Sequence, residues 1–156
     1  MHPVKPLILS LVTLFFAARA SALQDIYPDP SQAAGDIATA LQAAKASHRH
    51  IIVDFGGNWC PDCHVLDRYF HDETNAPLLD ANYVLVYVNI GRKDQNVGIA
   101  KRYNIPLDKG VPALAVLDSD GKLLFSQKTG EFEAMSGMQS PAVTAFLDQW
   151  KPATHR

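Results

Sequence analysis

The feature that most constrains the fold is a set of three short, mostly apolar runs separated by segments with helical spacing. The runs are Ile51-Ile-Val-Asp-Phe55, Tyr83-Val-Leu-Val-Tyr-Val-Asn89 and Val111-Pro-Ala-Leu-Ala-Val-Leu117. Short runs of this kind, without polar alternation, are typical of strands that are buried on both faces. Because strands that alternate with helices imply parallel pairing, the sequence predicts a single α/β domain.

Helical patterns fill most of the remaining chain. We expect helices over residues 29–47, 60–70, 94–103 and 141–150, the first opened by an Asp cap and the last by Pro141. A turn at residues 118–121 then leads into a strand over residues 122–126, which adds an antiparallel edge. The expected sheet is therefore mixed, has about four strands and carries helices on both faces.

The first 22 residues have the pattern of a signal peptide. A short basic stretch precedes an apolar run over residues 7–18, and Ala20-Ser21-Ala22 matches a cleavage site. The apolar run is shorter than the roughly 20 residues that cross a bilayer, although an uncleaved membrane anchor is the alternative. We expect cleavage after Ala22, export to the periplasm and one domain over residues 23–156.

Charge and composition exclude two classes of protein. The chain has 14 basic and 16 acidic side chains, and removal of Lys5 and Arg19 with the leader leaves 12 − 16 = −4. This balance offers no basic surface for nucleic acid, so we expect no nucleic-acid partner. A hydrophobic content of 47% excludes a disordered chain.

The two cysteines of the chain, Cys60 and Cys63, lie at the start of a predicted helix that follows a predicted strand. A thiolate at a helix start faces unpaired N–H groups and the positive end of the helix dipole, which lowers its pKa. Cys63, one turn further in, is close enough to form a disulfide with Cys60. Such a pair stores two electrons reversibly, whereas the alternative is a pair of inert structural thiols.

The segment Val53-Asp-Phe-Gly-Gly-Asn-Trp-Cys-Pro-Asp-Cys63 resembles the active-site segment of the thioredoxin family. Gly110-Val111-Pro112, about fifty residues later, is similar to the cis-proline loop of that family. The order of predicted elements agrees with the family over nearly the whole of residues 23–156. The resemblance implies a thioredoxin fold, with Cys60 as the nucleophile and Cys63 as the resolving thiol.

The same resemblance implies roles for four further residues. Asp54 occupies the place of the buried acid that accepts a proton from the second cysteine, and burial of an ionised Asp in an apolar strand is costly enough to raise its pKa. Val111 and a cis Pro112 are expected to lie against the disulfide and, with Trp59, to support substrate binding. The alternatives are a capped or solvent-facing Asp54 and a trans Pro112 that starts an edge strand.

Residues around the cysteines are expected to tune the reduction potential. Asp62, after Pro61, places a negative charge beside Cys60 and raises its pKa, whereas a protonated His64 opposes this effect. We therefore expect a potential in the reducing half of the range from about −270 mV to about −120 mV, unless Asp62 points into water and is screened. Gly56-Gly57 stands where the family has bulky residues, which predicts a flatter or more open surface.

Two other readings of the Cys60–His64 segment remain open. The segment matches the C-x-x-C-H attachment motif of c-type haem, with Met135 or Met138 as a distal ligand and His64 otherwise an exposed first-turn residue. It also offers three soft ligands for a copper or zinc chaperone, although no second cluster completes a site. We favour no metal, and expect His48, His50 and His71 to be solvated surface residues.

The sequence thus predicts a periplasmic thiol-disulfide oxidoreductase with a redox-active Cys60–Cys63 disulfide and no organic cofactor. Protein disulfides or dithiols are its expected substrates. A reductase or isomerase supplied with electrons by a membrane relay protein is favoured, and a dithiol oxidase is the alternative. We expect a monomer, because 156 − 22 = 134 residues leave no room for a separate dimerisation domain.

Overall fold

A computed structural model describes residues 25–153 of the chain. The predicted signal peptide, residues 1–22, lies outside the described residues. Within the described range, no helix has the length and apolar character needed to cross a membrane.

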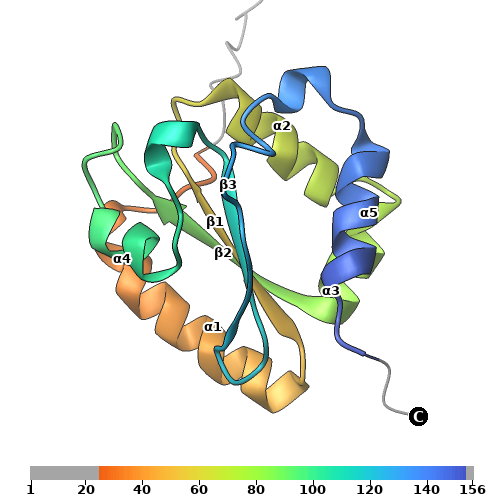
Figure 1. The fold of residues 1–156 in the computed structure, drawn as a ribbon. Coiled ribbons are helices and arrows are strands. Elements are labelled where there is room, and N and C mark those ends of the chain that lie inside the picture. Colours follow the sequence, from red (N-terminus) through yellow and green to blue (C-terminus); the bar gives the residue numbers. More distant parts are fainter. Residues whose placement is uncertain (1–24, 154–156) are drawn as a thin grey trace, which may run out of the picture.

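A mixed four-stranded sheet forms the centre of the domain, with strand order β2-β1-β3-β4 (Figure 1). β1 (His50–Gly56) pairs in parallel with β2 (Tyr83–Asn89) and in antiparallel orientation with β3 (Ala113–Leu117). β4 (Leu123–Ser126) forms the antiparallel edge next to β3. The predicted mixed sheet of about four strands is confirmed.

The direction of β3 corrects the expectation that the three apolar runs pair in parallel. The connection from β2 to β3 leaves the sheet at Asn89, beside Gly56, and returns at Ala113, beside Phe55, so it starts and ends at the same end of the sheet. Its helix, α4 (Val97–Arg102), has six residues and is therefore about 9 Å long. This helix covers only part of the length of a seven-residue strand of about 23 Å, and the connection stays at the carboxyl end of β1 and β2. β3 therefore enters the sheet at that end and runs against β1.

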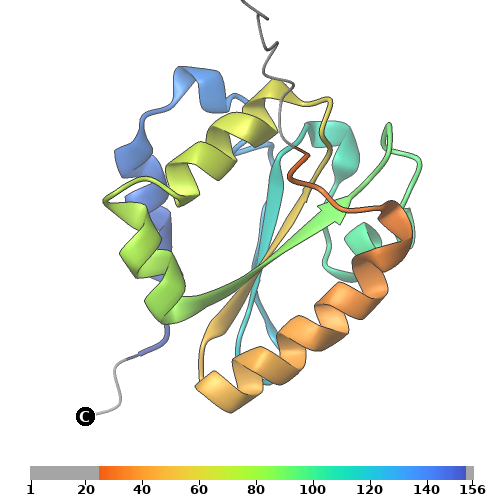
Figure 2. The ribbon, with the colours of Figure 1, turned by 180° about the vertical axis from the view of Figure 1, so that it is seen from behind.

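Helices cover both faces of the sheet, as Figure 1 and the opposite view in Figure 2 show. One face carries α1 (Ala33–Ser47), which follows the short 3-10 turn η1 (Pro30–Gln32), together with α4. The other face carries α2 (Pro61–Phe70), α3 (Asn75–Asn82) and α5 (Ser140–Trp150). Two further 3-10 turns are η2 (Leu107–Lys109) and η3 (Met135–Gly137).

Two helices differ from the sequence prediction. α3 is absent from it, because residues 75–82 contain Pro77 and lack an apolar stripe that would reveal a helix. α4 begins at Val97 rather than Asp94, because the N–H groups of residues 93–95 all donate to the Ile90 carbonyl and form a turn.

The sheet divides the hydrophobic core into two clusters. Ile51, Val53 and Phe55 pack with α1 and α4, whereas Ile52 packs with α2, α3 and α5. Because alternate side chains of a strand point to opposite faces, Asp54 lies on the Ile52 face, which α2 covers. β1 thereby places the Asp54 carboxyl group on the buried side of α2, the helix that begins at the cysteines.

Asparagine side chains fix residues 25–30, the N-terminal segment, across the end of the sheet. The N–H groups of Ile26 and Tyr27 both donate to Asn58 Oδ1 at 2.9 Å, and Asn58 Nδ2 donates back to the Tyr27 carbonyl at 2.9 Å. Asn89 and Asn96 donate to two proline carbonyls further along the segment, each at 2.8 Å. These contacts place Tyr27 at the carboxyl end of β1.

Candidate active site

Cys60 is the N-cap residue of α2, directly after the loop that follows β1. Its Sγ accepts a hydrogen bond from the Cys63 backbone N–H at 3.3 Å, and the thiol contacts the Val111 carbonyl oxygen at 3.5 Å. Pro61 occupies the first helical position, where a missing N–H removes no helical hydrogen bond. The sulfur therefore takes the place of the oxygen that usually caps a helix.

The two thiols differ sharply in acidity. A hydrogen bond from the Cys63 side chain lowers the pKa of Cys60 to about 7, while burial and the charge of Asp62 act in the opposite direction. The hydrogen bond to Cys60, burial and the charge of Asp54 all raise the pKa of Cys63. Near neutral pH, Cys60 is therefore the thiol that ionises. Both cysteines are free in this structure.

Asp54 is completely buried, and neither of its carboxyl oxygens has a hydrogen-bond partner of standard geometry. Burial raises its pKa well above the ordinary value, the Tyr27 hydroxyl lowers it, and the charge of Asp67 raises it further. The carboxyl group is thus neither capped nor solvent-facing. Its proton-transfer role stays a prediction.

The Val111–Pro112 peptide bond is cis, and both residues precede β3. Gln127, which is buried, holds this loop in place: Oε1 accepts from the Leu114 N–H at 3.1 Å and Nε2 donates to the Pro112 carbonyl at 3.2 Å. Gln127 therefore fixes the backbone directly after Val111, whose carbonyl lies next to Cys60.

Trp59 is exposed, with 38% of its surface accessible. The indole N–H donates to the Gly91 carbonyl at 2.6 Å, and the Arg92 guanidinium lies 5.2 Å from the ring centroid. This cation–π contact and the hydrogen bond hold the ring against the loop after β2. The indole therefore forms a fixed apolar surface beside Cys60.

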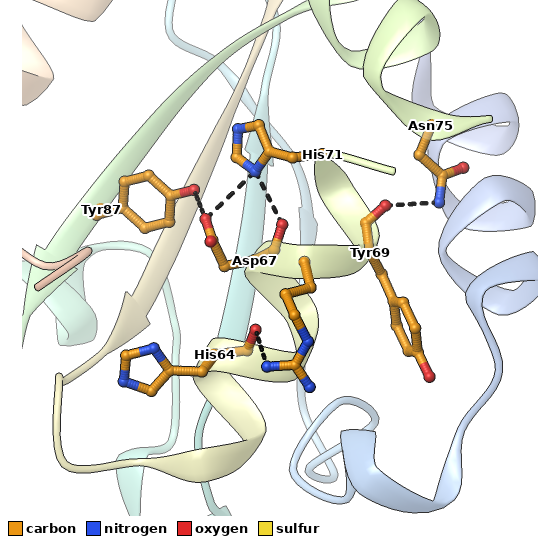
Figure 3. Close-up of polar contacts among 7 residues, drawn as sticks. His64, Asp67, Tyr69, His71, Asn75 and Tyr87 are labelled. Carbon is orange, nitrogen blue, oxygen red and sulfur yellow. Dashed lines mark hydrogen bonds and ion pairs between the residues drawn. The ribbon is translucent and has the colours of Figure 1, made fainter. Parts of the chain in front are cut away.

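The structure corrects the expected exposure of His64 and gives Asp62 a partner that the sequence did not reveal. Asp62 Oδ1 accepts hydrogen bonds from the Ser136 N–H at 2.7 Å and the Ser136 hydroxyl at 2.6 Å, so it joins α2 to η3 rather than pointing freely into water. His64 is buried, not exposed, because its ring Nε2 contacts the Asn58 carbonyl at 2.9 Å. Arg68 donates to the His64 carbonyl at 3.3 Å (Figure 3).

The two glycines before Trp59 do not open the surface, contrary to the sequence expectation. A methyl group on Gly56 would lie 2.6 Å from Tyr27 Cζ and 2.7 Å from Cys63 Sγ. A methyl group on Gly57 would lie 2.6 Å from the Trp59 indole nitrogen. The space that larger residues would occupy is filled by Tyr27 and Trp59.

The structure offers no support for the haem or metal alternatives. Among residues 25–153, no group of three or more His, Cys, Asp or Glu side chains is placed to hold a metal. Met135 is fully buried in the core, and Met138 packs against the same cluster. Both methionines thus contribute to the core cluster on the α2, α3 and α5 side of the sheet.

Two of the three described histidines outside the active-site segment, His50 and His71, have side-chain contacts. His48 is exposed and ends α1 in a left-handed conformation, whereas His50 is half-buried and contacts the Trp150 carbonyl at 2.7 Å. His71 is exposed and pairs with Asp67 at 3.3 Å, and Tyr87 donates to the same carboxylate at 2.5 Å (Figure 3). His50 thus departs from the expected solvated position, and His71 extends a polar chain from the surface to β2.

The family model described as thioredoxin-like matches residues 32–119. The chain belongs to the thioredoxin-like family. The thioredoxin fold and the family resemblance expected from the sequence are therefore confirmed.

Known proteins that resemble the chain include solved structures and a curated relative. A disulphide isomerase from Xylella fastidiosa Temecula1 has 30% sequence identity and a TM-score of 0.77, over 82% of this chain and 98% of that one. The reduced C-terminal domain of DsbD from Neisseria meningitidis shares the fold, with 17% identity and a TM-score of 0.53 over 76% of this chain and 96% of that one.

The curated relative is the thiol:disulfide interchange protein DsbD of Pseudomonas fluorescens, with 25% identity over 114 residues and 71% of this chain. The chain spans only 17% of the length of that protein. This relative and the Xylella isomerase support thiol-disulfide oxidoreductase chemistry in the present chain.

Sequence reasoning missed three residues that complete the site: Tyr27, Asn58 and Gln127. Each acts through a contact with a distant segment, such as the 31 residues that separate Tyr27 from Asn58 and the 13 that separate Gln127 from Leu114. The burial of Gln127 next to a conformationally special loop is a property of the fold and leaves no pattern in the chain.

Replacement of Gly56 tests the tight packing of Tyr27 against Cys63. We expect Gly56→Ala to lower the free energy of unfolding by about 1–3 kcal/mol, because the new methyl group overpacks a closed site. Gly35→Ala is the matched control: nothing lies within 4 Å of its added methyl group, so it should stabilise α1 by about 0.5–1 kcal/mol. Urea unfolding measures both, and equal effects would contradict the packing described here.

Asp54→Asn tests the buried carboxyl group through the pH dependence of stability. The folded-state pKa of Asp54 lies above its unfolded value, so its contribution to stability is full at low pH and is lost as the pH rises through the folded-state pKa. We expect the variant to gain about 1–3 kcal/mol over the wild type at pH 8 and less at pH 5. Exposed Glu73→Gln is the control, and a gain of equal size at both pH values would refute the assignment.

Proposed function

We propose that this protein is a periplasmic thiol-disulfide oxidoreductase that reduces or isomerises disulfides in other proteins. The observation that carries the proposal is the unequal acidity of the two cysteines at the start of α2. Cys60, with a pKa of about 7, supplies a thiolate near neutral pH, whereas the raised pKa of Cys63 keeps that thiol protonated in reserve. A nucleophile paired with a second thiol is the arrangement that disulfide exchange needs.

The proposed reaction has two exchange steps. The Cys60 thiolate attacks one sulfur of a substrate disulfide, which forms a mixed disulfide and releases the other substrate sulfur as a thiolate. Cys63 then loses its proton and attacks Cys60 Sγ, which releases the second substrate sulfur and leaves a Cys60–Cys63 disulfide. The substrate gains two electrons and the cysteine pair loses two.

Substrate binding is assigned to the surfaces that flank Cys60. The Val111 carbonyl lies 3.5 Å from Cys60 Sγ and belongs to the loop that Gln127 holds, so it can accept a hydrogen bond from an extended peptide. Trp59 provides the adjacent apolar surface, fixed by Gly91. With Asp54 as the proton acceptor and Pro61, Asp62 and His64 as tuning residues, these groups form the proposed active site.

The reducing direction is supported by the modest acidity of Cys60. A strongly stabilised thiolate favours the reduced protein and makes it an oxidant, as in DsbA with a pKa of about 3.5, whereas thioredoxin has a pKa of about 7. The pKa of about 7 for Cys60 is at the thioredoxin end, because burial and Asp62 oppose the hydrogen bond that stabilises the thiolate. A dithiol oxidase is the less favoured alternative.

The cellular context of the proposal rests on the leader pattern. We propose that residues 1–22 direct export and are removed after Ala22, and that residues 23–156 act as a single monomeric domain. A reductase in that compartment needs electrons from a membrane relay protein. The exchange itself needs no organic cofactor.

Single cysteine variants test the order of the two steps. We expect Cys60→Ser to abolish insulin reduction, and Cys63→Ser to accumulate mixed disulfides that a non-reducing gel resolves, because the second variant can start the reaction but cannot finish it. The double variant is the control for non-specific coupling. Insulin reduction by both single variants would contradict the mechanism.

The reduction potential tests the direction. We expect a value closer to about −270 mV than to about −120 mV, measured from Trp59 fluorescence in graded thiol-disulfide buffers. Asp62→Asn removes a charge that raises the pKa of Cys60, so its potential should shift towards the oxidising end. Ser136→Ala removes a hydroxyl partner of Asp62 but keeps the charge, so it should shift less. A wild-type value near −120 mV would favour the oxidase.

A further inference from the structure

Three buried side-chain polar atoms lack a hydrogen-bond partner of standard geometry in the part of the chain that the structure describes, and all three lie beside Cys63. They are the Tyr27 hydroxyl and the two carboxyl oxygens of Asp54. Buried polar atoms in native proteins are nearly always paired, because an unpaired one costs about 1–3 kcal/mol. Their concentration around one thiol indicates a function at that thiol.

Tyr27 reaches this position because Gly56 leaves room for it. A methyl group on Gly56 would collide with the Tyr27 hydroxyl and with Cys63 Sγ, so both atoms lie against the same face of this glycine. Tyr27 is 2% exposed, and Asp54 and Cys63 are fully buried, so bulk solvent does not reach between the three groups. Burial, followed by the charges of Asp54 and Cys63, raises the pKa of the Tyr27 hydroxyl.

The backbone and ring of Tyr27 are both held. Asn58 binds the backbone of Tyr27 on both its N–H and its carbonyl side, and Asn58 lies in the loop that leads to Cys60. The ring packs edge-on against Tyr87, with ring centroids 5.4 Å apart and an interplanar angle of 76°. The hydroxyl is therefore fixed between β1 and α2, where only its O–H bond can rotate freely.

We propose that the Tyr27 hydroxyl relays the proton of the Cys63 thiol to the Asp54 carboxylate when Cys63 attacks the mixed disulfide. This inference rests on the proposed exchange function and assigns a proton-relay residue to its second step. The N-terminal segment thereby contributes a group to a site that otherwise comes from β1, α2 and the Val111–Pro112 loop.

The relay balances with the exchange step. Tyr27 Oη accepts the proton from Cys63 Sγ while its own proton passes to an Asp54 oxygen, so the hydroxyl is unchanged at the end. The Cys63 sulfur forms a bond to Cys60 Sγ, and the bond from Cys60 Sγ to the substrate sulfur breaks. The electron pair leaves on the substrate thiolate, the cysteine pair is oxidised, and the substrate is reduced.

Other titratable groups face the relay from the neighbouring elements. Cys60 lies at the start of α2, Asp67 lies further along α2, and Tyr87 faces Tyr27 from β2. Asp67 accepts from Tyr87 and pairs with exposed His71 (Figure 3). Of these groups, Asp67 and Cys60 add to the effect of burial and raise the pKa of Asp54.

Tyr27→Phe tests the relay, because it keeps the ring and removes only the hydroxyl. Dithiobis(nitrobenzoate) releases one coloured thiolate when Cys60 attacks and a second when Cys63 resolves, so stopped-flow absorbance separates the two steps. We expect an unchanged first release and a second release slowed at least about tenfold at neutral pH. Tyr83→Phe, which removes a buried hydroxyl that donates to the Leu147 carbonyl at 2.6 Å, should leave both rates unchanged.

The pH profile separates a relay from a packing role. In the wild type the second release should level off once Asp54 is ionised, whereas in Tyr27→Phe it should rise about tenfold per pH unit between about pH 6 and 8, because hydroxide must then take the thiol proton. A slower second release with an unchanged profile would overturn the relay, as would a second release at the wild-type rate.

A double variant and a stability measurement complete the test. If Tyr27 and Asp54 act in one relay, Tyr27→Phe combined with Asp54→Asn should be no slower than the slower single variant, and multiplied effects would refute the relay. The unfolding midpoint of Tyr27→Phe should be unchanged or higher, because an unpaired buried hydroxyl is lost. A wild type that releases no second thiolate at all would contradict the proposed exchange function itself, and not only the relay.

Discussion

One hydrogen bond, from the Cys63 backbone N–H to Cys60 Sγ, is the interaction on which the rest of the site depends. It exists because β1 ends in a loop that leaves Cys60 at the N-cap of α2, where helical N–H groups have no partner within the helix. The same geometry places Cys63 one turn deeper, over the buried face of the sheet. The contact between the two thiols, together with this helix cap, thus makes two chemically identical side chains unequal, one ready to ionise and the other kept as a thiol.

The buried side of the site, around Asp54 and Tyr27, disfavours negative charge, whereas the helix start favours a thiolate on Cys60. Asp54 and the Tyr27 hydroxyl are removed from water and lack partners of standard geometry, which opposes stability, while Asn58, Asn89 and Asn96 satisfy the backbone of the segment that carries Tyr27. The backbone around the site is therefore well hydrogen-bonded, whereas the polar side-chain atoms next to Cys63 lack partners of standard geometry. Such a division is typical of sites where stability is given up for reactivity.

Much of the architecture could be predicted from the chain because it rests on local patterns. The apolar runs over residues 51–55 and 83–89 are strands, and the stripe that begins at Val143 is the buried face of α5. The direction of β3 depends instead on the end of the sheet at which the connection after β2 returns, and α3 has no apolar stripe to reveal it. Tyr27 and Gln127 reach the site only through contacts between distant segments, and the burial of His64 follows from the Asn58 carbonyl next to its ring. Tertiary contacts of this kind leave no periodicity in a sequence.

The two ends of the described chain lie at opposite ends of β1. Asn58 ties Ile26 and Tyr27 to the end that carries Cys60, whereas the carbonyl of Trp150 contacts His50 at the other end, about 23 Å away along seven residues. A fusion partner or surface tether attached ahead of residue 25 is therefore held beside the cysteines, where it competes with incoming proteins for space. The same attachment placed after residue 153 leaves the reactive end of the domain facing away from the support.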